Sequence, residues 1–521
     1  ISGGIAGINN GRITNSYNES VIYGNKGVGG ITGINSYWIE NVTNALSING
    51  KNVNRTSENV GGIVGIQQDN INIVEGDDRT AHVENGRNTA TIHGDINVGG
   101  IVGSNSKNSE LHNLENGFMV EINGWKNVAG YNEGRIAADG MELVNSGKII
   151  GNENVGGVAG TNNGIIQNIS TDVKLEATGT QAKYFGGTVG FNDTKGVIQD
   201  AKNKSIIEAE DADAVGGIVG LNTGTLQGME NTSSGKVIGG SHVGGIIGRN
   251  TESIQATKKQ KWESRLVEKH YWDIKKDENG EPVLDGNGAF IWEERIEKVN
   301  ELVPVYKPAL DNNGNPIIDA DGNSVYTDEP IYEYVNTRIA NEGTVIATKG
   351  GAGGIIGTNE ANLTQVTMIN HGDVHGNDTT SADGTGGLIG TNSGDIRYSS
   401  LINSLNGQVT GISNVGGLIG VNKGHVEGGR AQDTDHDLSS DGSHAVDAGY
   451  YVNTIYNNGT IQVGSYTKDA DGNYVLGAAN ANSQNIGGLV GDNQSTITAG
   501  YNTGVIKAGN STNVGGIAGR N

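Results

Sequence analysis

The chain has 521 residues, among them 87 glycines and no cysteine, and its formal net charge at pH 7 is −23. This acidic balance argues against nucleic acid or anionic lipid as a partner, since both carry negative phosphates. The absence of cysteine excludes a thiolate-ligated zinc or iron–sulfur site and is compatible with a location outside the cell. No segment approaches the roughly 20 apolar residues that cross a bilayer, so we expect no membrane insertion.

A phrase close to Asn-Val-Gly-Gly-Ile-Val-Gly-x-Asn recurs along the whole chain. Its first paired glycine is found at Gly3, Gly29, Gly61, Gly99, Gly156, Gly186, Gly216, Gly244, Gly353, Gly386, Gly416, Gly487 and Gly515. A weaker copy covers residues 128–132, and most copies follow one another after 26 to 38 residues. Two steps are longer, at 109 and 71 residues (353 − 244 and 487 − 416). A period near thirty is typical of a solenoid, in which each unit stacks on its neighbours.

Each repeat contains about three short β-branched runs, separated by Asn, Gly, Asp and Ser residues that favour turns. Residues 341–347, 353–359 and 363–370 form one such set. This pattern predicts an all-β fold: a parallel β-helix, expected to be right-handed, with three strands per coil. Counting the weak copy and one unmarked coil within the 71-residue step gives about fifteen coils, or a rod about 70 Å long.

Two columns of residues support the stacking. We expect the aliphatic residue after the glycine pair to be interior; the next position is also apolar, which strict alternation does not explain. Two residues after the third glycine, an amide recurs and is expected to form a structural ladder from coil to coil. The asparagines are Asn9, Asn35, Asn105, Asn162, Asn192, Asn222, Asn250, Asn359, Asn392, Asn422 and Asn493, with Gln67 as an exception that keeps the amide.

Residues 251–338 differ from the repeats on either side, because all five prolines and three of the five tryptophans lie there. We therefore predict three parts: a first solenoid segment over 1–250, an inserted module over 251–338, and a second solenoid segment over 339–521. Asn-Gly and Asp-Gly pairs between apolar residues predict β-hairpins in the insert. A short helix is expected around residues 258–270, and the module is expected to project from the rod.

The aromatic residues of the insert have two possible roles. They could form a ligand-binding surface, because recognition concentrates in protruding loops and aromatic side chains. They could instead form the small core that the insert needs. The residues concerned are Trp262, Trp272, Trp292, Tyr326, Tyr332 and Tyr334.

Two short acidic motifs resemble the start of a calcium loop. Asp319 and Asp321 precede Gly322, and Asp469 and Asp471 precede Gly472. Neither motif continues with the glycine and glutamate that the loop requires, so both are interpreted as turns, with weak calcium binding as the alternative. Acidic residues elsewhere form no repeating column, as the carboxylate pairs of polysaccharide-cleaving β-helices would require. We predict that the chain is not an enzyme and needs no cofactor.

The repeated phrase resembles the GLUG motif of bacterial surface proteins, named for Gly-Leu-aliphatic-Gly. It is matched most literally at residues 387–390, 417–420 and 488–491. Such repeats occur in filamentous-haemagglutinin-like adhesins and before the catalytic domain of immunoglobulin A1 metallopeptidases. The resemblance implies an extracellular β-solenoid that is not itself catalytic. The zinc motif His-Glu-x-x-His of those peptidases is absent from this chain.

These observations predict the non-catalytic shaft of a large bacterial cell-surface or secreted adhesin, with a role in cell adhesion and virulence. Its partners would be a protein or glycan on a host or neighbouring cell. The alternatives are the repeat stalk of an immunoglobulin A1-type metallopeptidase and direct binding of host glycan or protein by the insert. Because the sequence begins and stops inside a repeat, we also expect it to belong to a larger polypeptide.

Overall fold

The computed structural model describes the chain apart from residues 50–55, 69–80, 108, 113–114, 117–120, 124–125, 129, 133–134, 138–142, 146–147, 180, 261, 276–291, 305, 309–325, 331, 336, 378–382, 429–454, 478–482 and 499. For most residues in the strands of 112–145 and 257–335 it describes the backbone alone. The chain divides into two compact units, one formed by residues 1–255 and 336–521 and the other by residues 256–335. The insert is thus shorter by a few residues at each end than the predicted span of 251–338.

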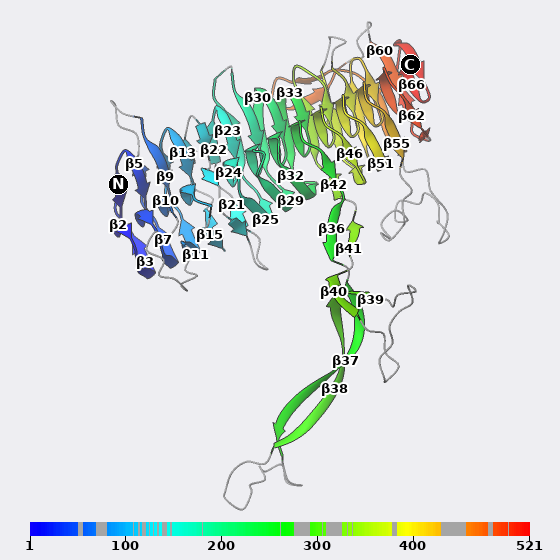
Figure 1. The fold of residues 1–521 in the computed structure, drawn as a ribbon. Helices are drawn as coiled ribbons and strands as arrows, with labels where there is room; N and C mark the ends of the chain where they lie inside the picture. The colour runs from blue at the N-terminus through cyan, green and yellow to red at the C-terminus, as the bar shows by residue number, and fades with distance from the viewer. Residues whose placement is uncertain are drawn as a thin grey trace, which may run out of the picture. The chain divides into compact units, whose positions relative to one another are not determined.

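The first unit is a parallel β-solenoid, as the repeat pattern predicts (Figure 1). Its strands form three sheets that run along the stack, called here sheets A, B and C, with 25, 14 and 19 strands in the described residues. Sheet B contains one strand per coil and therefore counts the coils. Its strands are β2 (Ala6–Asn9), β6 (Thr32–Asn35), β10 (Val64–Gln67), β14 (Val102–Asn105), β19 (Tyr131–Asn132), β24 (Ala159–Asn162), β28 (Val189–Asn192), β31 (Val219–Asn222), β34 (Ile247–Asn250), β45 (Ile356–Asn359), β50 (Ile389–Asn392), β54 (Ile419–Asn422), β61 (Val490–Asn493) and β66 (Ala518–Arg520).

One coil near the middle shows the plan. The chain runs along sheet C in β29 (Val197–Asn203), along sheet A in β30 (Ile206–Gly216) and along sheet B in β31. It then returns to sheet C as β32 (Thr225–Asn231), one coil further on. Every strand of the coil pairs in parallel with its equivalent in the next coil, so the three short runs of each repeat are three sides of one turn.

Sheet A is the widest side of the coil. Its long strand β30 pairs with both β26 (Lys174–Ala177) and β27 (Lys183–Gly186) of the preceding coil. On its other side it pairs with β33 (Lys236–Gly244), with a register shift between Ala209 and Asp213. Most coils therefore cross sheet A as two short strands with an irregular step between them.

The glycine pair forms the corner between sheets A and B. A Cβ atom at Gly217 would lie 2.0 Å from the carbonyl oxygen of Gly245 in the next coil, so no larger residue fits without movement of the backbone. After this corner the amides of Ile218 and Val219 both donate to the carbonyl oxygen of Ile246. Glycine recurs here because the backbones of neighbouring coils approach too closely for a side chain.

Both apolar columns after the glycine pair lie inside the solenoid. Ile218 and Val219 are fully buried in the cluster between sheets B and C, as are their equivalents Ile63 and Val64. The chain turns from sheet A into sheet B at this point, so two consecutive side chains point inward, which simple alternation within a strand does not allow. Ile5 differs, because in the first described coil it is 46% exposed.

The coil count is lower than predicted. Sheet B has fourteen strands rather than about fifteen, because the 71-residue step contains no coil of its own: β54 pairs directly with β61. The 109-residue step also contains no coil of its own, since β34 pairs directly with β45. Both steps are insertions within single coils, and the stack continues across them.

The second unit consists of antiparallel strand pairs. β37 (Trp262–Ile274) pairs with β38 (Trp292–Pro304) in unbroken register. β36 (Thr257–Gln260) pairs with β41 (Tyr332–Val335), and β39 (Tyr306–Pro308) pairs with β40 (Tyr326–Pro330). The helix expected over 258–270 is wrong, because this segment is strand. Its charged and apolar residues suit a helix face locally, but pairing with a partner about thirty residues away decides its conformation.

Candidate functional site

The predicted asparagine column is a chain of buried side-chain hydrogen bonds. Asn192 donates its amide to the side-chain oxygen of Asn222 at 2.9 Å, and Asn222 donates to Asn250 at 2.8 Å. The same contact crosses both insertions, from Asn250 to Asn359 at 2.9 Å and from Asn422 to Asn493 at 2.8 Å. The side-chain amides thereby satisfy one another's hydrogen-bonding groups inside a buried corner of the solenoid.

Gln67 changes the ladder locally. It accepts a hydrogen bond from Asn35 at 3.3 Å, but its own amide donates to the backbone carbonyls of Ala81 and Glu110. Among the described residues, the side-chain oxygen of Asn105, the next residue of the column, therefore has no hydrogen-bond partner. The predicted exception therefore keeps the amide chemistry but not the continuity of the ladder.

A second buried asparagine ladder, which the sequence analysis missed, lies at the corner between sheets C and A. Asn203 donates to Asn231 at 2.8 Å, Asn231 to Asn341 at 2.6 Å and Asn341 to Asn370 at 2.7 Å. Asparagine at the end of many sheet C strands, such as β29 and β32, was the available signal. The ladder continues through Asn403, Asn457 and Asn502 and has separate members at Asn18, Asn44 and Asn88.

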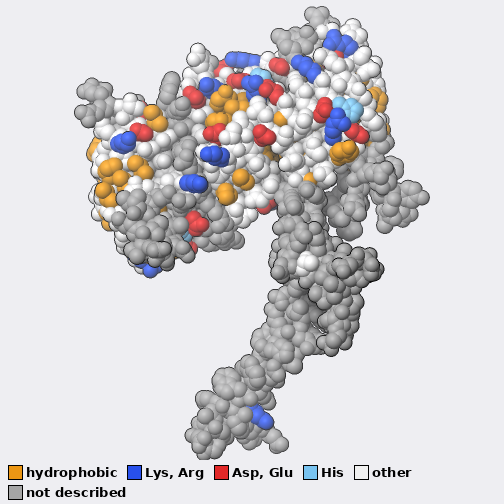
Figure 2. Space-filling view, in the orientation of Figure 1, with side chains coloured by type: hydrophobic (Ala, Val, Ile, Leu, Met, Phe, Trp, Pro, Cys, Tyr) orange, Lys and Arg blue, Asp and Glu red, His pale blue; other side chains and the backbone are white. Residues whose placement is uncertain are grey.

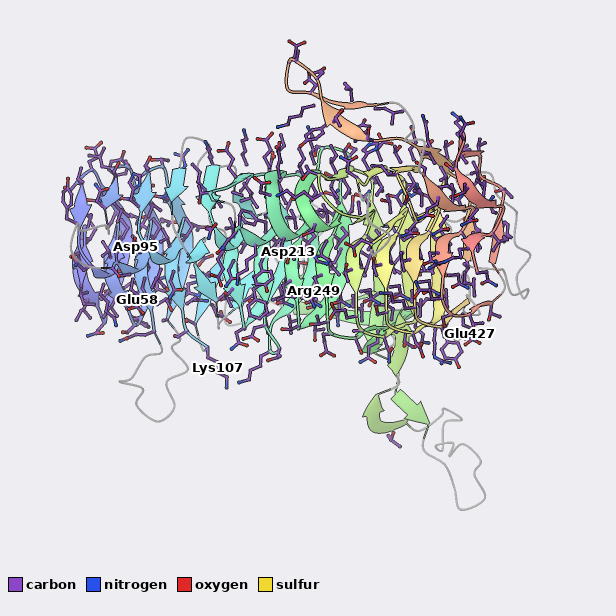
Figure 3. The ribbon with its side chains drawn as sticks, turned by 90° about the horizontal axis from the view of Figure 1, so that it is seen from above. Glu58, Asp95, Lys107, Asp213, Arg249 and Glu427 are labelled. Carbon is purple, nitrogen blue, oxygen red and sulfur yellow. The ribbon has the colours of Figure 1, made fainter. Side chains whose placement is uncertain are left out.

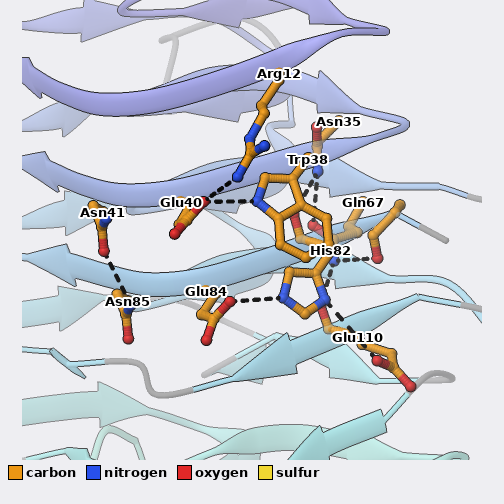
Figure 4. Close-up of polar contacts among 11 residues, drawn as sticks. Arg12, Asn35, Trp38, Glu40, Asn41, Gln67, His82, Glu84, Asn85 and Glu110 are labelled. Carbon is orange, nitrogen blue, oxygen red and sulfur yellow. Dashed lines mark hydrogen bonds and ion pairs between the residues drawn. The ribbon is translucent and has the colours of Figure 1, made fainter. Parts of the chain in front are cut away.

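The outward face of sheet C carries an aromatic stack near the first coils (Figure 4). Trp38, on β7 (Trp38–Asn44), is stacked on His82 with ring centroids 4.1 Å apart, and the guanidinium of Arg12 lies 5.5 Å from the Trp38 ring centroid. Arg12 and the Trp38 indole nitrogen both donate to Glu40, at 2.7 and 3.1 Å. The hydrogen bond from Arg12, followed by that from Trp38, lowers the pKa of Glu40. Neighbours already contact the indole ring of Trp38, so this stack is interpreted as packing between coils.

Several charged side chains on the outer face of sheet A form ion pairs between coils. Lys174 lies 3.0 Å from both Glu176 and Glu208, and Lys148 lies 3.0 Å from Glu176. Figure 2 shows Lys, Arg, Asp and Glu side chains interspersed over the visible face of the solenoid. Residues 208–213 contain four acidic residues, and each of them has a basic partner: Glu208 pairs with Lys174, Glu210 with Lys468, Asp211 with Lys349 and Asp213 with His242.

An Asp–His pair lies on the same sheet. Asp213 is 2.5 Å from the Nδ1 atom of His242 and accepts a hydrogen bond from Ser241 at 2.7 Å. Burial works against ionisation of Asp213, but the hydrogen bonds from His242 and Ser241 outweigh it and lower its pKa. The hydrogen bond to Asp213 raises the pKa of His242. Ser241 and His242 both bond to the carboxylate, so the histidine does not activate the serine as in a catalytic triad.

The most distinctive surface of the solenoid is a covered stripe on sheet A. Strand register aligns Glu208, Ile238, Ile346, His375 and Thr410 in five successive coils. These positions alternate with interior residues and so lie on the outer face, yet the stripe from Ile238 to Thr410 is buried. We call these five residues the sheet A stripe.

A hairpin from a later coil lies over this stripe. It consists of β58 (Tyr466–Lys468) and β59 (Tyr474–Leu476), and residues 466–476 are called here the strap. Figure 3 shows the strap in orange, outside the stack and over coils drawn in green and yellow. The Tyr466 ring is stacked on His375 with centroids 3.6 Å apart and planes within 7°. At the other end, Lys468 forms an ion pair with Glu210 on β30.

The turn of the strap contains one of the two predicted acidic motifs. The carboxylate of Asp469 accepts hydrogen bonds from the backbone amides of Asp471 and Asn473, at 3.0 and 2.9 Å. It therefore closes a turn, as the first interpretation of this motif proposed. Asp319 and Asp321 lie outside the described residues. Among the residues that are described, no group of three or more His, Cys, Asp or Glu side chains is placed to hold a metal ion.

The six aromatic residues proposed as a binding surface are spread over three strand pairs. Trp262 and Trp272 lie in β37, Trp292 begins β38, Tyr326 begins β40, and Tyr332 and Tyr334 lie in β41. The structure describes their backbone only. Register sets Trp292 opposite Ile274 and Trp272 opposite Glu294, so the tryptophans at that end of the ribbon occupy nearby positions.

The chain matches no protein-family model, no curated protein and no solved structure. The resemblance to GLUG repeats therefore stays a prediction carried by the sequence. No helix long and apolar enough to cross a membrane occurs in the described ranges.

Proposed function

We propose that the chain is the structural, non-catalytic shaft of a large bacterial cell-surface or secreted adhesin, of the kind that carries GLUG repeats. In this role the solenoid holds binding regions away from the envelope, where they meet a protein or glycan on another cell. The observation that carries the proposal is the unbroken stacking of fourteen coils, which continues in register across both insertions. Parallel pairing at roughly 4.8 Å per coil makes this a rod of about 65 Å.

The structure supports a mechanical role in a second way. Two ladders of buried asparagine amides run along the corners, and every coil is hydrogen-bonded to the next on three sides. Load along such a stack is shared among many equivalent interfaces, as in other repeat proteins. A spacer that bears load needs this property.

The proposal is tested in the full-length protein on the surface of its own bacterium. Residues 1–521 are replaced by an unrelated β-solenoid with the same number of coils, and adherence to cultured epithelial monolayers is measured. A shaft is interchangeable, so we expect the replacement to restore the adherence that deletion of these residues removes. Loss of adherence with an equally exposed, length-matched replacement would show that this chain itself makes the binding contact.

A second candidate function is recognition by the inserted unit, and one observation favours it. β37 and β38 form a ribbon of two 13-residue strands, and an isolated two-stranded ribbon is marginally stable in water. A ribbon of this length is well suited to pair with or pack on a partner surface. Deleting residues 256–335 from the full-length protein tests this: binding of the purified protein to the same monolayers would fall while the circular dichroism of the solenoid stays unchanged.

A further inference from the structure

The sheet A stripe changes character along the stack: the charged Glu208 is followed by the apolar Ile238 and Ile346, and then by His375 and Thr410. Ile238 and Ile346 lie on the outer face of sheet A, since their neighbours Val237 and Val345 are interior, and they are only 2% and 1% exposed. One coil earlier the same position is held by Glu208, which forms a surface ion pair with Lys174. Covering two adjacent isoleucines on an outer face removes apolar surface from water, and this stabilises the covered state.

The strap is held at two places along this stripe. At the His375 end, the side chain of Asn377 donates to the backbone carbonyl of Tyr466 at 2.6 Å and accepts from its backbone amide at 2.7 Å. At the other end, Lys468 pairs with Glu210, and the Tyr474 hydroxyl shares a hydrogen bond with the same carboxylate. The two isoleucines lie between these ends in the register of the sheet. Besides the ring stack of Tyr466 on His375, these end contacts are hydrogen bonds and one ion pair, and the chain has no cysteine that could fix the strap by a disulfide.

His375 lies beneath the strap as a neutral ring. It is 5% exposed, and within the described part of the chain neither ring nitrogen has a hydrogen-bond partner. The groups that face it are Tyr466 from the strap, Ile346 and Thr410 from the adjacent strands, and Asp373 from its own strand. Burial lowers the pKa of His375 to about 4, and no neighbouring charge offsets that penalty among the described residues.

We propose that the strap is an acid-released latch, which covers the sheet A stripe at neutral pH and detaches when His375 takes up a proton. Detachment exposes Ile238, Ile346 and the His375 ring on one face of the solenoid. The stripe then becomes an apolar surface that is absent at neutral pH. This behaviour goes beyond the proposed role as a shaft and does not depend on it.

The direction of the pH dependence follows from proton binding. With the strap detached, His375 returns to its ordinary pKa of 6.5, so between about pH 4 and 6.5 the detached state binds more protons than the docked state. The equilibrium constant for docking of the strap is therefore at its maximum above pH 6.5 and decreases as the pH falls. The decrease is roughly 30-fold at pH 5 and roughly 300-fold well below pH 4. Burial raises the pKa of Asp373, which favours docking at the acid end and opposes the effect there. The test accordingly stays between pH 5 and 7.5.

The first experiment measures hydrogen exchange of the strap amides in the whole chain, Tyr466 above all, by mass spectrometry at pH 7.5 and pH 5. The control is His375→Phe, which keeps the ring stack without a titrating group. Dividing the exchange rates of the wild type by those of this variant at the same pH removes the intrinsic pH dependence of exchange. We expect protection of the wild-type strap relative to the control to fall roughly 30-fold between the two conditions. An equal pH response in both proteins, or an unprotected wild-type strap at pH 7.5, would overturn the proposal.

A second measurement does not depend on the folding of the phenylalanine variant. The strap is replaced by a short Gly-Ser turn, and the pKa of His375 is measured by NMR in the wild type and in this variant. We expect about 4 in the wild type and a return toward 6.5 in the variant. An ordinary pKa in the wild type, or no change after removal of the strap, would show that the strap does not control this histidine.

Discussion

Two insertions leave the same solenoid, and they relate to it in different ways. Residues 256–335 depart after β35 (Ile254–Gln255) and form a compact unit in which the described strands pair with one another. The strap departs after β57 (Thr460–Val463) and packs instead on the outer face of sheet A. The strands of the strap also pair with each other, but the strap is held on the coils by the stack of Tyr466 on His375 and by the ion pair of Lys468 with Glu210.

The difference shows what the coils themselves require. Across the first insertion Asn231 still donates to Asn341, 110 residues later, and across the step that contains the strap Asn422 still donates to Asn493. The stack therefore continues where the glycine and asparagine corners are kept, and it accommodates both of these additional segments. What an inserted segment does then depends on its own residues, such as the tyrosines that face the sheet A stripe.

The largest expected effect comes from a corner glycine. In Gly245→Ala the new Cβ would lie 2.1 Å from the carbonyl oxygen of Gly354, on the far side of the first insertion. The two coils would have to separate, and we expect a loss of about 3 kcal/mol in the free energy of unfolding. Urea denaturation followed by circular dichroism measures this, with hydrogen exchange of β34 and β45 to localise it.

Gly350→Ala is the matched control, because an added Cβ there would meet nothing closer than the Cα and Cβ atoms of Ser241, at 3.4 Å, an ordinary van der Waals contact. It should change the free energy of unfolding by less than about 0.5 kcal/mol. Similar losses in both variants would mean that the glycines serve chain flexibility rather than close packing, and the account of the corners given above would be wrong.

The next largest effect is expected in the second asparagine ladder. Asn231→Leu removes both the acceptor for Asn203 and the donor to Asn341, and leaves two buried amide groups without these bonds. We expect a loss of about 2 to 3 kcal/mol, seen as faster exchange in the coils on both sides of the first insertion. Gln199→Ala breaks a similar amide contact on the outer face, 2.6 Å from Gln227, and should lose less than about 1 kcal/mol. Equal losses would contradict a special role for the buried ladder.

The two ladders also show how far the sequence could be interpreted. The first ladder was predictable because its asparagines, for example Asn222 and Asn250, stand at a constant distance in sequence from the glycine pair. The second was missed because the length of chain between the ladders varies: Asn203 follows Asn192 by 11 residues, but Asn457 follows Asn422 by 35. A column is visible in a sequence only when the spacing within the repeat is constant.

Non-local pairing accounts for the other differences. The segment 258–270 was assigned to a helix because its residues alone do not reveal β38 as a partner. The strap could be predicted as a turn from Asp469 and Gly472, but its docking on His375 and Glu210 joins residues 91 and 258 positions apart (466 − 375 and 468 − 210). The parallel fold, by contrast, follows from contacts between successive repeats, which the sequence displays.

A smaller effect concerns the pH dependence of stability at His242. Here stability decreases as the pH rises, whereas docking of the strap weakens as the pH falls. The pKa of His242 is raised by its hydrogen bond to Asp213, so this pair stabilises the fold below pH 6.5, and the stabilisation is lost as the pH rises through the raised pKa. Both side chains are partly exposed, so we expect only a few tenths of a kcal/mol. Exchange of the β30 and β33 amides, corrected for intrinsic rates, should be slower at pH 6 than at pH 8. Asp213→Asn should remove this difference, and its persistence would assign it to another group.

The smallest effect is expected from removing the first insertion entirely. Thr337 donates its hydroxyl to the carbonyl oxygen of Gln255 at 2.9 Å, so the two ends of the gap are already adjacent in the solenoid. Deleting residues 256–335 should change the free energy of unfolding of the remaining solenoid by less than about 1 kcal/mol, because closing a loop depends only weakly on its length. Deleting the strap should instead raise hydrogen exchange in β30, β33 and β48 (Asp373–His375), which it covers. If deletion of 256–335 destabilised the coils more than deletion of the strap, the insert would be part of the solenoid's own fold, and the distinction between the two insertions would fail.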